Sequence, residues 1–118
     1  MFEQKDEKTV PVSTVKRDLE SQKRNVAEHL RDCSDKLSRR IQGMDEQIED
    51  ADKKLKISLG ELRTRLIKEK IKVDRSIKDI EHSTDKSWNK MQKKAGAILT
   101  EAKIETQKIE ERVENLID

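Results

Sequence analysis

The residue types most able to do chemistry are a histidine and a cysteine near the start of the chain. His29 and Cys33 are four residues apart, so on a helix they share one face and could supply two zinc ligands. Two copies of the chain would be needed to complete a site with four ligands. Because a buried free cysteine usually behaves as a small hydrophobic residue, we interpret Cys33 as a core residue and predict no metal site.

A second candidate lies further along the chain, where His82 and Asp85 could act as metal ligands or as an acid–base pair. The sequence around them supplies no third partner and no glycine-rich loop. The Glu-x-x-His motif of di-iron bundles has one approximation, Asp79 followed by His82. Since no catalytic constellation can be assembled from these residues, we predict no cofactor and expect that the protein is not an enzyme.

Two basic clusters are candidates for binding phosphates. The net charge of the chain is only +2, however, and Trp88 is the one aromatic residue near the clusters that could stack on a base. We therefore expect the clusters to face acidic segments of the protein, and nucleic acid is not a favoured partner. The clusters are Arg63, Arg65, Lys68, Lys70, Lys72, Arg75 and Lys78, and Lys86, Lys90, Lys93 and Lys94.

The composition limits the kind of fold that can hold these residues. Charged residues make up 44% of the chain and hydrophobic residues 31%, which disfavours a thick layered core. Three glycines and one proline are too few for the turns of a sheet protein. The polar N-terminus does not resemble a signal peptide and no stretch of 18 apolar residues occurs, so we expect a cytoplasmic location.

An apolar stripe from Val15 to Leu116 predicts an all-α protein. Apolar residues recur at steps of three or four residues, with polar exceptions at Gln22, Lys70, Thr84 and Thr106. The average step of about 3.6 residues is that of a straight α-helix rather than a heptad coiled coil. We therefore predict long, nearly straight amphipathic helices over residues 13–118, in antiparallel coiled-coil-like pairing, preceded by a flexible polar tail over residues 1–12.

The pairing can be satisfied in more than one way. Acidic residues 45–52 and basic residues 68–75 would meet if the chain were reflected about Gly60, and such charges can set the register of paired helices. This pattern favours either a helical hairpin with a turn near residues 58–61 or a continuous long helix in an oligomer. The alternative is a three-helix bundle that turns at Gly43 and at residues 82–85.

The stripe also carries the functional prediction. It widens around residues 55–80, where we expect a contact with a further helix. We predict a non-enzymatic helical protein that self-associates through the stripe and acts as a spacer, scaffold or filament subunit. Its expected partners are further copies of the chain, in a homo-oligomer, or the helices of other proteins. The alternatives are an amphipathic helix on a lipid surface and a nucleic-acid-compacting protein. The predicted interface residues are Leu55, Leu59, Leu62, Leu66, Ile67, Ile71, Val73, Ile77, Ile80 and Trp88.

Overall fold

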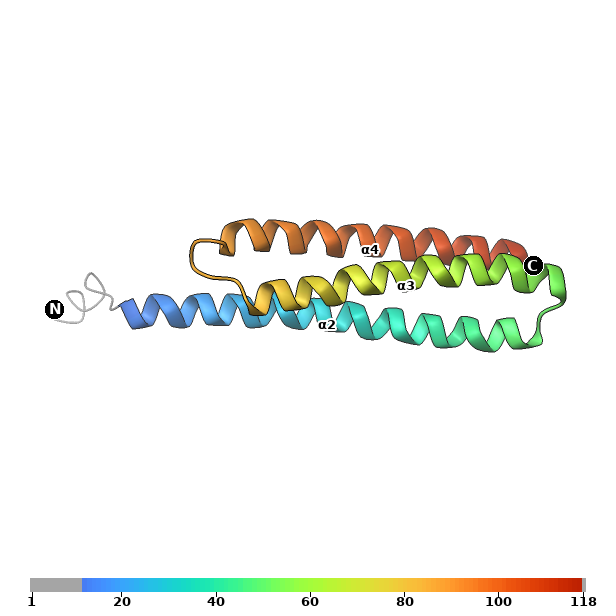
Figure 1. The fold of residues 1–118 in the computed structure, drawn as a ribbon, viewed down its shortest axis with the longest axis horizontal. Coiled ribbons are helices and arrows are strands. Elements are labelled where there is room, and N and C mark those ends of the chain that lie inside the picture. The colour runs from blue at the N-terminus through green and yellow to red at the C-terminus, as the bar shows by residue number, and fades with distance from the viewer. Residues whose placement is uncertain (1–11, 118) are drawn as a thin grey trace.

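The computed structural model describes the backbone of residues 12–117 and the side chains of residues 18–117. Three helices follow one another: α2 spans Val12–Asp50, α3 spans Lys53–Glu81 and α4 spans Trp88–Ile117. Helices that follow one another in the chain run antiparallel, so α2 and α4 run in the same direction (Figure 1). The three-helix alternative is therefore confirmed, and the described backbone is all-α. The predicted tail lies outside the described residues, apart from Val12, with which α2 begins.

The apolar stripe forms the core of this bundle. Its most deeply buried side chains come from all three helices and recur at helical spacing, every seventh residue in α4. The middle helix, α3, packs closely against both neighbours, whereas α2 and α4 make few contacts with each other. The core comprises Ala27, Leu30, Leu37 and Met44 of α2, Leu59, Leu62, Leu66, Val73 and Ile80 of α3, and Trp88, Ala95, Ala102 and Ile109 of α4.

The first chain reversal lies at Ala51–Asp52, so both sequence-based predictions of its position are wrong. Gly43 lies inside α2, and residues 58–61 lie inside α3. Asp52 begins α3 as its N-cap, with its carboxylate accepting a hydrogen bond of 2.8 Å from the backbone N–H of Leu55. The turn is so short that the stripe crosses it in phase, which is why the periodicity did not reveal it.

The second reversal lies between His82 and Ser87, where the three-helix alternative placed it. The hydroxyl of Ser83 donates to the carbonyl of Ile80 (2.6 Å) and closes the end of α3. Thr84 and Ser87 then exchange hydrogen bonds between backbone N–H groups and side-chain hydroxyls ahead of α4. Lys23 of α2 holds this loop through a 2.6 Å hydrogen bond from its Nζ to the carbonyl of Ser83.

Polar residues on the stripe connect the helices. Gln22 accepts a 3.0 Å hydrogen bond from the indole Nε1 of Trp88, which joins α2 to the start of α4. Asp74 of α3 accepts hydrogen bonds from the hydroxyl of Ser34 on α2 (2.5 Å) and from Nζ of Lys70 (2.7 Å). Of the polar exceptions, Gln22 thus contacts a second helix directly and favours one alignment of the helices, whereas Lys70 bonds within α3 to Asp74, which in turn contacts α2.

The predicted pairing of charges about Gly60 is wrong in its register. Arg63, rather than a residue of 68–75, pairs with Asp45, and Arg31 pairs with Glu81 at 3.2 Å. The helices align according to the fit of their cores, because exposed ion pairs contribute little free energy compared with apolar burial.

Candidate functional site

An open groove runs between α2 and α4 because these two helices are not in close contact. Its apolar wall is formed by Leu37 and Met44 of α2, Leu66 of α3, and Ala102 and Ile109 of α4. Two hollows lie along it, with volumes of about 340 and 510 Å³. We define the α2–α4 groove by these two hollows. Space of this size beside apolar side chains can accept the side chains of another helix.

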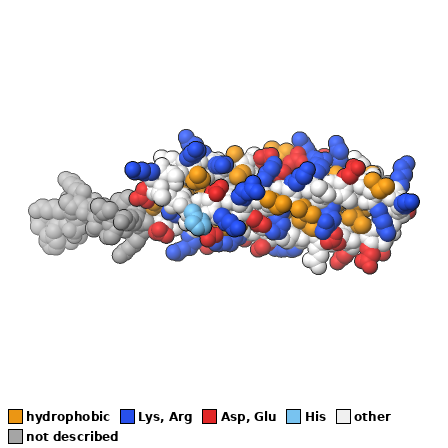
Figure 2. Space-filling view, viewed as in Figure 1, with side chains coloured by type: hydrophobic (Ala, Val, Ile, Leu, Met, Phe, Trp, Pro, Cys, Tyr) orange, Lys and Arg blue, Asp and Glu red, His pale blue; other side chains and the backbone are white. Residues whose placement is uncertain are grey.

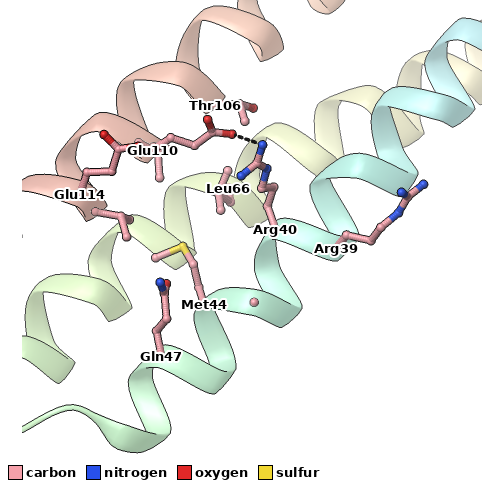
Figure 3. A pocket seen from close by; sticks show the side chains of 11 residues that line it. Arg39, Arg40, Met44, Gln47, Leu66, Thr106, Glu110 and Glu114 are labelled. Carbon is pink, nitrogen blue, oxygen red and sulfur yellow. Dashed lines mark ion pairs between the residues drawn. The ribbon is translucent and has the colours of Figure 1, made fainter. Parts of the chain in front are cut away.

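One ion pair crosses the groove. The guanidinium of Arg40 on α2 reaches the carboxylate of Glu110 on α4 at 2.6 Å, above the side chains of Met44 and Leu66 (Figure 3). Arg39 points away from this pair in the same view. Because both partners are partly exposed, the pair contributes modestly to stability and does not close the groove.

Gly43 leaves a gap in the α2 side of the groove. It is half-buried, and a Cβ atom built on it would meet no other atom within 4 Å. Its φ is not positive, so neither the backbone nor the packing within one chain requires glycine there. A glycine in a helix interior costs about 1 kcal/mol relative to alanine. The sequence had suggested a turn at Gly43, but the structure instead places it where a partner could approach the helix closely.

His29 and Cys33, the pair considered as zinc ligands and interpreted instead as a surface residue and a core residue, also lie in the groove, on α2. Cys33 is half-buried, and this burial raises the pKa of its thiol despite the opposing charges of Lys103 and Lys36. His29 directs its Nδ1 to the backbone carbonyl of Asn25 at 2.7 Å. Within residues 18–117, no three side chains of His, Cys, Asp or Glu are grouped to hold a metal ion. The thiol therefore stays protonated at neutral pH and packs as an apolar group.

The second candidate pair sits at the end of α3. His82 is exposed, and its Nδ1 lies 2.8 Å from the backbone carbonyl of Lys78. Its backbone N–H also bonds to the last turn, so the residue serves as the C-cap of α3. Asp85 is exposed in the following loop. None of the described hollows is lined by either residue.

Most of the predicted interface residues are buried inside a single chain. Six of them are no more than 5% exposed, and Leu55 and Ile77 are half-buried against the same core. Ile67 is half-buried, whereas Ile71 is 50% exposed. The widened part of the stripe was expected to contact a further helix, and α3 does pack against two helices. Ile57 and Ile71, however, face solvent. The six buried residues are Leu59, Leu62, Leu66, Val73, Ile80 and Trp88.

The basic clusters divide between paired and unpaired side chains. Arg65 bonds to Glu105 at 2.8 Å, and this hydrogen bond lowers the pKa of the Glu105 carboxyl against a smaller effect of burial. Lys72 bonds to Glu101 and Glu69 at 3.2 Å each, which raises the pKa of its ammonium group. The cluster Lys86, Lys90, Lys93 and Lys94 is exposed and forms no ion pair within residues 18–117, so the expected contact with acidic segments is not seen there.

Comparison with protein-family models, with curated proteins and with solved structures finds no match for this chain. Within the described residues, no helix combines the length and apolar composition needed to cross a bilayer. The fold and the groove define a three-helix bundle with one open side, between α2 and α4.

Proposed function

We propose that this chain is a non-enzymatic helical interaction protein that self-associates through the α2–α4 groove. The observation that carries the proposal is the open side of the bundle. Two hollows there are floored by core side chains that are at most 4% exposed, and they are also lined by Cys33, Leu99 and Val113, which a single chain leaves half-buried. A second copy placed on this side would remove the remaining apolar surface from water, which is the main favourable term in protein association.

The proposed contact surface is the α2–α4 groove and not the apolar stripe expected from the sequence, because the fold buries the stripe. A single chain already buries most of the stripe as its own core, so self-association through those residues would require the bundle to open. The same reasoning disfavours a continuous amphipathic helix on a lipid surface, since that arrangement would also expose the core. Cytoplasmic location and a role as spacer, scaffold or filament subunit are part of this proposal.

A pair of matched glycine variants tests the proposal. Gly43→Glu places a charged side chain in the groove, and Gly60→Glu places the same side chain in α3, away from it. Both glycines are half-buried, and in neither case would a Cβ meet an atom within 4 Å. Both variants should therefore fold, which circular dichroism can verify.

Light scattering coupled to size-exclusion chromatography then gives the mass at increasing protein concentration. We expect the wild-type chain and Gly60→Glu to form the same oligomer and Gly43→Glu to remain a monomer. A wild-type chain that stays monomeric at every concentration would refute self-association. An oligomer that Gly43→Glu leaves intact would refute the groove as its contact surface.

A further inference from the structure

The outer side of the contact between α3 and α4 is rich in basic side chains. The ion pairs of Arg65 and Lys72 with glutamates of α4 mark this side of the contact. Lys68 lies three residues after Arg65 and four before Lys72, and Arg75 follows Lys72 by three. Residues with this spacing share one face of a helix. Four consecutive basic positions of α3 therefore face the same way.

The face of α4 beside these residues is also rich in basic side chains. Glu101 lies on this face, and its ion pair with Lys72 shows that the face adjoins the basic positions of α3. Lys94 and Lys108 lie seven residues before and after Glu101, and Lys90 and Arg112 continue the spacing at the two ends. All four are exposed. Several Lys and Arg side chains project along the upper edge of the molecule in Figure 2, where Figure 1 places α4.

These side chains form a surface with an excess of positive charge, although the whole chain carries only +2. Five acidic residues lie on or beside the same helix faces: Glu61 and Asp79 at the ends on α3, and Glu69, Glu101 and Glu105 within ion pairs. The eight basic residues outnumber them by three, and six of the eight form no ion pair within residues 18–117. We call this surface the basic face: Arg65, Lys68, Lys72, Arg75, Lys90, Lys94, Lys108 and Arg112.

Two large apolar side chains lie among these charges. Ile71, between Lys68 and Arg75 in the helical spacing, is 50% exposed, and Ile104, four residues before Lys108, is 49% exposed. Within one chain this exposure has no packing benefit. Proteins bind single-stranded nucleic acid through aromatic side chains that stack on bases, and none lies on these positions. Duplex DNA would be bound by the basic side chains alone, which would leave Ile71 and Ile104 without a role. Apolar side chains among lysines instead fit the headgroup region of a lipid bilayer, which is anionic at its surface and apolar beneath it.

We propose that the basic face binds the surface of an anionic phospholipid bilayer. The lysine and arginine side chains contact the phosphate and carboxylate groups of the lipids, and Ile71 and Ile104 insert between the headgroups. The bundle stays folded, because the residues involved lie outside its core. The proposal does not depend on the α2–α4 groove, which uses another side of the molecule.

Vesicle sedimentation of the full chain tests the proposal with two lipid compositions. We expect binding to vesicles of phosphatidylcholine mixed with phosphatidylserine, none to phosphatidylcholine alone, and weakening by salt. A basic residue near such a surface contributes a factor of about five in affinity. The double variant Lys68→Glu with Lys94→Glu should therefore lose at least about a hundredfold. If it misfolds by circular dichroism, the glutamine substitutions at the same positions replace it, with a loss of about twentyfold.

The matched control is Arg24→Glu with Lys56→Glu. This pair makes the same change in net charge at exposed positions of α2 and α3 that belong neither to the basic face nor to the α2–α4 groove, and should bind the mixed vesicles nearly as well as the wild type. Equal losses in the two double variants would overturn the proposal, since binding would then follow net charge alone. Absence of binding to the mixed vesicles would also overturn it. Binding of duplex DNA without binding of vesicles would assign the basic face to nucleic acid instead.

Discussion

Replacing Gly60 by alanine distinguishes the three-helix fold from a hairpin that turns at this residue. In the structure Gly60 lies within α3, its φ is not positive, and a methyl group there would meet no atom within 4 Å. Alanine avoids the entropy that glycine loses in a helix, which amounts to about 0.5–1 kcal/mol. Gly60→Ala should therefore raise the free energy of unfolding by that amount and the melting temperature by about 2–5 °C.

Circular dichroism during thermal and urea denaturation measures both quantities. Protein concentration must be held constant, because association would itself stabilise the folded chain. Gly96→Ala is the control, since Gly96 lies within a helix in either architecture and its Cβ position is equally open. A gain in stability at Gly96 together with a loss at Gly60 would show that the chain turns at Gly60, and would refute the reversal at Ala51–Asp52.

Two further predictions concern the core and the polar contact between α2 and α3. Leu66→Ala should lower the free energy of unfolding, measured in urea, by about 2–5 kcal/mol, because Leu66 is 2% exposed. Ile71→Ala should lower it much less, because Ile71 is 50% exposed. Equal losses of unfolding free energy in the two variants would contradict the assigned burial. Burial opposes ionisation of Asp74, but hydrogen bonds from Lys70 and Ser34 outweigh it and lower the pKa of this carboxyl below 3.8. The stability it contributes is present at neutral pH and is lost as the pH falls through the lowered pKa, so Asp74→Asn should reduce the drop in melting temperature between pH 7 and pH 2. An unchanged drop would contradict the role of the ionised carboxylate.

The second reversal was predictable because its residues differ from those of the helices around it. Residues 82–87 combine a histidine with serine, threonine and aspartate, types that form caps and turns through local hydrogen bonds. At the first reversal Asp52 carries a similar signal, since aspartate is a favoured N-cap. That signal was hidden in a stretch where most residues are acidic, so one more aspartate did not stand out.

The candidate surfaces were less predictable than the helices. The stripe identifies which side chains prefer to leave water, but it does not say whether they meet another part of the same chain or a second chain. The groove arises because α2 and α4 both pack on α3 and barely contact each other. The basic face arises because the alignment of α3 with α4 pairs Arg65 with Glu105 and Lys72 with Glu101, and leaves Lys90 and Lys94 without ion pairs among the described residues.

The sequence by itself determined that this protein is built from long amphipathic helices, because the helical period of its apolar residues is a local property that persists for about 100 residues. It also identified Gln22 and Lys70 among the polar exceptions in the apolar stripe. Tertiary structure alone decided where the chain reverses and which stretches align. The two-residue reversal at Ala51–Asp52 keeps the stripe in phase, and the alignment depends on side-chain packing between helices that are distant in the sequence. The open groove and the basic face exist only as consequences of that alignment.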